Sequence, residues 1–266
     1  HGVEIMQDVN SRKLTWQRIG LVVWVVLNLV AIHSHGWAGD FPFKPGERLT
    51  YALRWGFIPA GEAVLEVQPM AEVEGKAAYH FVMTAKSNSF IDAFYKVRDR
   101  IDAYADANMQ HSVLFTKKQR EGNYKRDVVI SFDWVRNQAQ YENKGKKKDP
   151  IPLMPGTFDP LSAFYYIRHM EMTPGAKISQ PITDGKKNVE GEVTAVKRES
   201  IKVDCKSYDT YLIIPDLKHV GGVFKESENA KMEIWVSADS RHIPVRLKSK
   251  VVVGSFVGVL VKIEGK

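Results

Sequence analysis

The sequence predicts a mainly β protein: a large curved antiparallel sheet or part-open β-barrel with one covering α-helix and a short helical lid. Apolar and polar residues alternate with a period of two along most of the chain from residue 47 onward. Turn-forming Gly, Pro, Asn and Asp residues separate these alternating stretches. One stretch has the apolar spacing of a complete helix, so a single helix is expected to serve a sheet of ten or more strands.

The first three expected strands follow one another as a meander. Residues 49–55 and 63–67 alternate apolar and polar side chains, and Pro59-Ala60-Gly61 between them predicts a turn. Gly75-Lys76 predicts the next turn, before a strand over residues 79–85. Further strands are expected at residues 100–104, 113–119, 127–132, 138–142, 177–182, 189–198, 209–214, 231–236, 243–250 and 255–263.

Residues 87–97 interrupt the alternation and form the expected lid. Four apolar residues at helical spacing follow Ser89, whose hydroxyl suits the N-cap of a short helix. These four residues are Phe90, Ile91, Phe94 and Tyr95.

Asp159-Pro160 predicts the start of the covering helix. The aspartate can accept hydrogen bonds from the free N–H groups of the first turn, and proline loses no hydrogen bond at the first helical position. The apolar spacing continues for about 13 residues and ends before Pro174-Gly175.

Residues 39–266 are expected to form a single β-rich domain. Residues 146–156 carry three prolines and a lysine triplet, so any subdivision is expected there.

Residues 1–38 have the layout of an export signal. Arg12, Lys13 and Arg18 precede an apolar run over residues 19–32, and Gly36-Trp37-Ala38 offers a small-x-small cleavage pattern. The run is shorter than the roughly 20 residues that a spanning helix needs, which favours a cleaved signal over an uncleaved anchor. The expected mature chain begins at Gly39 without a cysteine for lipid attachment, so we expect a periplasmic protein that is not a lipoprotein.

Positive charge concentrates between residues 117 and 148, although the formal net charge of the whole chain is only +7. Outside the cytoplasm the available polyanions are anionic lipid head groups, lipopolysaccharide phosphates and acidic glycans, and nucleic acid is not an expected partner. The alternative is a solvated strand face without a partner. The candidate residues for binding an anionic surface are Lys144, Lys146, Lys147 and Lys148.

The common catalytic and metal-binding signatures are missing from the sequence. It contains no HExxH, GxSxG, CxxC, Walker or GxGxxG motif, and the histidines are scattered, so we expect no metal site and no cofactor. One carboxylate cluster is a weaker candidate for acid–base chemistry. It consists of Asp92, Asp99, Asp102 and Asp106.

Aromatic residues gather on the lid and on the covering helix. They are expected to border a partly apolar cavity between the sheet and its two covers, and the alternative is that they fill the core. The candidate ligand-binding residues are Phe90, Phe94, Tyr95, Phe164, Tyr165 and Arg168.

Five motifs together resemble the exported bacterial family catalogued as domain of unknown function 3108. The resemblance covers essentially all of the expected mature chain and implies a β-rich periplasmic or surface-exposed protein of Gram-negative bacteria without an assigned reaction. More weakly, the expected architecture is similar to the half-barrels of lipoprotein carriers. The motifs are Phe43-x-Pro45-Gly46-Glu47-x-Leu49-x-Tyr51, Trp55-Gly56-x-x-Pro59-Ala60-Gly61, Glu121-Gly122-x-Tyr124, Asp159-Pro160-Leu161-Ser162-Ala163-x-Tyr165-x-x-Arg168 and Ile234-Trp235-x-x-Ala238-Asp239-x-x-x-x-Pro244-Val245.

Three functional hypotheses follow from these observations. The first is a non-catalytic periplasmic binding or carrier protein for a lipid or another amphiphilic component of the envelope. The second is an envelope assembly or structural factor that binds a glycan or a protein partner. The third is an enzyme with a dispersed carboxylate site that combines the aspartate cluster with Arg168.

Overall fold

The computed structural model describes residues 41–216, 231–251 and 254–265. The expected export signal in residues 1–38 and the turn expected at Gly221-Gly222 lie outside these residues. No helix in the described ranges is long and apolar enough to span a bilayer.

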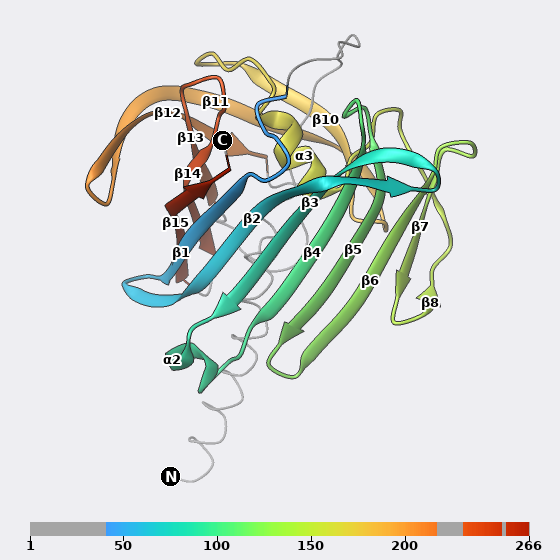
Figure 1. Ribbon diagram of the computed structural model, residues 1–266, viewed down its shortest axis with the longest axis horizontal. Coiled ribbons are helices and arrows are strands. Elements are labelled where there is room, and N and C mark those ends of the chain that lie inside the picture. The colour runs from blue at the N-terminus through green and yellow to red at the C-terminus, as the bar shows by residue number, and fades with distance from the viewer. Residues whose placement is uncertain (1–40, 217–230, 252–253, 266) are drawn as a thin grey trace.

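Fifteen strands form one antiparallel sheet within the described ranges (Figure 1). Two helices accompany them: α2 (Ser89–Asp92) and α3 (Pro160–Ile167). The strands are β1 (Arg48–Trp55), β2 (Ile58–Val73), β3 (Lys76–Ser87), β4 (Arg98–Asp106), β5 (Ser112–Glu121), β6 (Tyr124–Asp133), β7 (Gln138–Asn143), β8 (Lys146–Lys147), β9 (Ile151–Pro152), β10 (Lys177–Thr183), β11 (Asn188–Val203), β12 (Lys206–Pro215), β13 (Lys231–Ser237), β14 (Pro244–Val251) and β15 (Gly254–Glu264).

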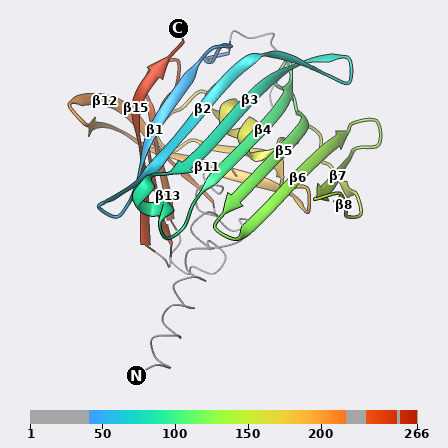
Figure 2. The same ribbon diagram turned by 60° about the horizontal axis from the view of Figure 1, so that its bottom comes forward.

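The strand order runs from β10 to β15, continues through β1 and ends at β8, with β9 paired beside β7. The only neighbours that are not consecutive along this path are therefore β15 and β1, which join the two halves of the chain in one ladder. Figures 1 and 2 show the sheet bending strongly around α3. The ladder ends at β10 and at β8, so the described sheet is not closed into a barrel.

The first turn differs from its expected position. The chain turns at Gly56-Phe57, where Trp55 pairs with Ile58, and not at residues 59–61. Gly56 has a φ of 59°, a left-handed conformation that glycine adopts without steric cost. The Pro59-Ala60-Gly61 stretch lies inside β2, and the register shift opposite Leu53 and Arg54 makes it a β-bulge.

The covering helix α3 is shorter than expected, with eight residues in place of about 13. It ends because its last turn tightens: the backbone N–H groups of Arg168, His169 and Met170 donate to carbonyls three residues earlier. All eight residues of α3 are buried.

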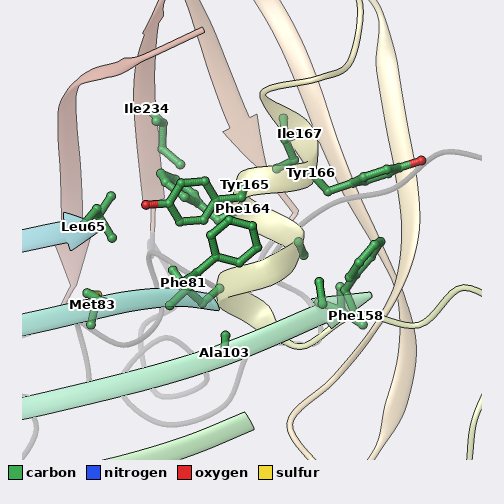
Figure 3. Close-up of a cluster of buried hydrophobic side chains, with 14 of the residues drawn as sticks. Leu65, Phe81, Met83, Ala103, Phe158, Phe164, Tyr165, Tyr166, Ile167 and Ile234 are labelled. Atoms are coloured by element: carbon green, nitrogen blue, oxygen red, sulfur yellow. The ribbon is translucent and has the colours of Figure 1, made fainter. Parts of the chain in front are cut away.

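Aromatic packing holds α3 against the inner face of the sheet. The Tyr165 ring stacks on Phe81 of β3 with 4.1 Å between ring centroids, and Phe43 meets both rings edge to face. Figure 3 shows Phe164 and Tyr165 extending from the helix toward the side chains of β2 and β3. The core is therefore centred between this helix and the middle strands.

The two halves of the sheet also meet on the other side of the core. The turn between β10 and β11 packs on the inner face of β6 and β7, where Lys186 lies over the Tyr141 ring. A Cβ atom added at Gly185 would meet the Ile130 and Tyr141 side chains at about 3 Å, so only glycine fits this approach. At this contact, side-chain packing and not strand pairing joins the two halves of the described sheet.

We predict that Asp159→Ala destabilises the protein by about 2 kcal/mol or more, at the upper end of the range for N-caps. The buried carboxylate accepts from the backbone of Leu161 and Ser162 and from the Ser112 and Ser162 hydroxyls, and all four donors would lose their partner. Chemical denaturation measures the change. Asp184→Ala, which removes a half-buried turn carboxylate that accepts only from the Lys186 and Lys187 backbone, should cost at most about 1 kcal/mol, and equal losses in the two variants would contradict the prediction.

Candidate ligand-binding site

An apolar cavity of about 130 Å³ lies on the inner face of the sheet, between α3 and the segment that carries α2. Its walls come from the side-by-side strands β14, β15, β1, β2 and β3. The lining residues are Tyr51, Leu53, Arg54, Trp55, Ala60, Ala63, Leu65, Met83, Ala85, Lys86, Ser87, Ile91, Tyr95, Val97, Phe164, Leu247, Ser249, Phe256, Val257 and Gly258.

Small residues on the inner face create this space. Tyr51 pairs with Ala63, and Ala63 pairs with Ala85, so two alanines lie side by side on adjacent strands. The next inward-facing pair on the same two strands, toward α3, is Leu65 with Met83, and these larger side chains fill the space at that position. Because α3 has only eight residues, it covers this middle part of the face and leaves the alanine end to α2.

Asn88 holds the α2 segment across that end. Its side-chain oxygen accepts from the Ile91 backbone at 2.9 Å, so Asn88 is the N-cap and the expectation of Ser89 was wrong. Its amide nitrogen donates to the Pro59 carbonyl at 2.7 Å, and its backbone N–H donates to the Ala60 carbonyl at 3.0 Å. The cap residue therefore fixes both the helix start and its position against β2.

The candidate aromatic residues divide into three groups. Tyr95 and Phe164 line the cavity. Tyr165 is fully buried in the core beside Phe81 and outside the cavity lining, with its hydroxyl lacking a hydrogen-bond partner among the described residues. Phe90 and Phe94 point away from the cavity and are largely exposed, while Ile91 of the same helix points inward.

Arg168 lies at the far end of the inner face in a buried ion pair. Its two terminal nitrogens donate to the Glu47 carboxylate at 2.6 and 2.9 Å, and its guanidinium lies over the Phe43 and Tyr165 rings. A wider and more polar hollow of about 760 Å³ adjoins this pair, between the start of β1 and the turn before β14. The bidentate geometry satisfies Arg168 within the protein and ties α3 to the first strand.

A buried charged cluster borders the cavity one strand further along the sheet. Asp99 pairs with the lining residue Ala85, and Lys117 and Glu121 face the same side from β5. Burial raises the pKa of Glu121 to about 8, with the neighbouring Asp99 carboxyl adding to the rise, and burial lowers the pKa of Lys117 to about 7. Tyr95 separates this cluster from the cavity, and burial raises the pKa of its hydroxyl.

The four candidate aspartates do not gather in one place. Asp99 belongs to the buried cluster, whereas Asp92 pairs with Arg98 and Asp102 accepts from His80 and Arg100. Asp106 accepts from the backbone of the turn after β4. In the described residues no three His, Cys, Asp or Glu side chains are placed to hold a metal ion.

The candidate basic residues lie in the hairpin formed by β7 and β8. Lys144 is in the turn, and the side chains of Lys144, Lys146, Lys147 and Lys148 are all exposed. The Lys144 backbone N–H donates to the Asp127 carbonyl, near the start of β6. This turn is therefore at the same end of the sheet as the turn between β5 and β6.

Sequence reasoning missed most of the cavity wall and, apart from Asp99, the buried charged cluster. The alternation along β5 could have predicted the cluster. Lys117, Gln119 and Glu121 follow the apolar Phe115 at every second position, so their side chains point to the same inner face. The wall had no such signal, because Ala63 and Phe256 reach the same cavity only through the pairing of β1 with β2 and with β15.

The sequence profile described as "Protein of unknown function (DUF3108)" matches residues 50–261. The chain belongs to this family. The family match confirms the resemblance carried by the five motifs, and no curated protein matches the sequence.

Three solved structures match the chain at low sequence identity, one of them with a TM-score above 0.5. A β-barrel-like protein of domain of unknown function DUF1849 from Brucella abortus is 13% identical, with a TM-score of 0.51 over 83% of this chain and 97% of that one. A Bacteroides fragilis protein, provisionally described as exported and with a YmcC-like fold, is 14% identical, with a TM-score of 0.38 over 85% and 98%. The hypothetical protein CT021 from Chlamydia trachomatis is 10% identical, with a TM-score of 0.36 over 84% and 87%. The first of these supports the mainly β, barrel-like fold of the DUF3108 chain.

We predict that Glu121→Gln flattens the pH dependence of stability between about pH 5 and pH 7. With its raised pKa, Glu121 keeps a proton in the folded state that the unfolded chain releases above its ordinary pKa, so wild-type stability falls as pH rises. Lys117 acts in the opposite direction, but only above its folded pKa of about 7. Urea unfolding at several pH values measures the slope, the exposed Glu72→Gln serves as control, and a slope unchanged in Glu121→Gln would refute the assignment.

We also predict that Glu47→Gln costs about 3–5 kcal/mol, because it leaves the Arg168 charge buried without its carboxylate. The double change Glu47→Leu with Arg168→Met should recover most of that loss, since it removes both charges. Asp133→Asn breaks the exposed pair with Arg136 and should cost at most about 1 kcal/mol. A double variant as unstable as Glu47→Gln would show that the charges themselves stabilise the fold.

Proposed function

We propose that this DUF3108 protein is a non-catalytic periplasmic binding or carrier protein for a lipid or another amphiphile. The observation that carries the proposal is the cavity on the inner face, whose walls are almost entirely apolar. The cavity opens beside α2 and the β1–β2 turn, where its two exposed lining residues, Arg54 and Lys86, lie. Apolar, concave and largely preformed spaces are the usual sites for small ligands. An acyl chain is the simplest envelope component that such walls accept.

With α2 in place the cavity is too small for a whole lipid and accepts only part of an acyl chain. Sites for drug-sized ligands measure about 300–1,000 Å³, and this cavity is smaller at about 130 Å³. The α2 segment has a single helical turn and few contacts with the sheet, so its displacement is the least costly way to enlarge the space. We infer that the segment acts as the lid and that Ile91 and Tyr95 exchange sheet contacts for contacts with the ligand.

The exposed lysines of the β7–β8 hairpin support a second role in the same function. Four lysines without burial on one short hairpin produce a positive surface that anionic lipid head groups or lipopolysaccharide phosphates attract. We infer that Lys144, Lys146, Lys147 and Lys148 bring the protein to such surfaces. An assembly factor that binds an acidic glycan or protein would use the same hairpin, and this is the alternative function.

We predict that Ala63→Phe lowers the affinity for a fatty acid at least about tenfold, because the new ring occupies the cavity between Tyr51 and Ala85. Isothermal titration with a fatty acid below its micellar concentration measures the affinity. Ala52→Phe adds the same ring on the outer face of β1 and should bind like wild type if it folds. Equal binding by both variants would contradict the location of the site.

Trp55 lines the cavity and allows a second, direct measurement. We predict that a fatty acid brominated along its chain quenches wild-type tryptophan fluorescence on binding and that Trp55→Phe abolishes most of this quenching. In the expected mature chain from Gly39 the other two tryptophans, Trp134 and Trp235, lie outside the lining and remain as internal references. Saturable binding without a Trp55 contribution would place the ligand elsewhere, and no saturable binding of any amphiphile would favour the assembly-factor alternative.

A further inference from the structure

Large apolar side chains are exposed around the cavity opening, although a soluble protein normally keeps such groups covered. Phe57 is 100% exposed, Phe94 67%, Phe90 59% and Ile58 41%. We call these four residues the apolar rim. They come from two turns of the chain that Asn88 joins through its hydrogen bonds to Pro59 and Ala60.

The residues of the apolar rim are close neighbours in the chain of residues that line the cavity. Phe57 follows the lining residue Trp55 by two positions, and Phe90 and Phe94 flank the lining residue Ile91. The two phenylalanines of α2 pack edge to face with 5.7 Å between ring centroids. Figures 1 and 2 both place α2 beside the β1–β2 turn at one end of the sheet.

Positive charge accompanies these aromatic residues. Three half-buried acids lie in the β1–β2 turn, the α2 segment and the β5–β6 turn, and each is paired with a cation of the same region, while Asp99 and Glu121 are buried. Arg54, Lys96 and Lys125 are exposed in addition, so these three described segments carry surplus positive charge. The matched pairs are Glu62 with Lys86 at 3.0 Å, Asp92 with Arg98 at 2.6 Å and Asp127 with Arg120 at 2.5 Å.

We infer that this end of the sheet docks on an anionic lipid bilayer, with the apolar rim inserted among the head groups. Aromatic and aliphatic side chains next to lysine and arginine match the two layers of a membrane interface, where apolar groups enter and cations meet phosphates. A protein partner could bury the aromatic residues as well, but the cationic surround and the cavity opening favour a lipid surface. The basic β7–β8 hairpin lies at the same end and adds to the attraction.

Docking in this orientation places the cavity opening at the bilayer. An acyl chain would then pass between the membrane and the cavity without crossing water, which is the costly step for free transfer. This consequence rests on the proposed carrier function, whereas the docking itself does not. The two can therefore fail separately.

Vesicle flotation tests the docking with phosphatidylcholine vesicles that contain or lack phosphatidylglycerol. Wild type should float with the anionic vesicles, and the triple variant Phe57→Ser, Phe90→Ser, Phe94→Ser should bind them at least about tenfold more weakly with an unchanged melting temperature. The control Val135→Ser changes an apolar residue that is 94% exposed at the opposite end and should bind like wild type. Equal binding by the triple variant and wild type would overturn the inference.

A site-specific dye tests the docking independently of the triple variant, whose loss of binding could also come from a folding defect. In a Cys205→Ser background, Phe57→Cys or Val135→Cys carries one environment-sensitive dye. The dye at position 57 should shift to the blue on anionic vesicles, and the dye at position 135 should not. Equal behaviour of the two dyes would overturn the proposed orientation, and the Ala63→Phe variant, which blocks the cavity, should still float like wild type.

Discussion

Successive side chains of a strand point to opposite faces, so a sheet of this size has an entire inner face that must be shielded from water. This constraint organises the molecule. The sheet bends around α3, and every residue of that helix is buried because strands approach it from several sides. Asp159 accepts hydrogen bonds from the N–H groups of the first helical turn, and the ion pair between Arg168 and Glu47 links the end of the helix to the start of β1. One eight-residue helix still cannot cover the whole face.

What α3 leaves uncovered explains the candidate site. At one end the β10–β11 turn packs over β6 and β7 and completes the core. At the other end Ala63 and Ala85 leave space, and a single helical turn closes over it. The same shortage of covering elements thus produces both a filled core and an apolar cavity. A ligand for the cavity would supply the contacts that side chains provide elsewhere.

The position of the polar groups fits this division. Asp99, Lys117 and Glu121 occupy inner-face positions next to the cavity, yet Tyr95 lies between them and the space itself. Arg168 is satisfied at the far end by Glu47. The cavity walls are left apolar, while the exposed cations lie outside it around the apolar rim. Charged side chains are therefore available for contacts at the surface, and apolar side chains for contacts inside the cavity.

The sequence by itself determined the thirteen longer strands, the aspartate-capped helix and the family, because alternation, capping and turn residues are local properties. It did not predict the two-residue strands β8 and β9, which have too few residues to show an alternation. It placed the β1–β2 turn too late and the end of α3 too far, since a bulge and a tightening last turn depend on neighbouring strands. It named Tyr95 and Phe164 for the cavity but could not separate them from Phe90, Phe94 and Tyr165. Only the tertiary structure decided which aromatic side chains face the space, because the pairing of β15 with β1 and the placement of α2 against β2 join residues far apart in the chain.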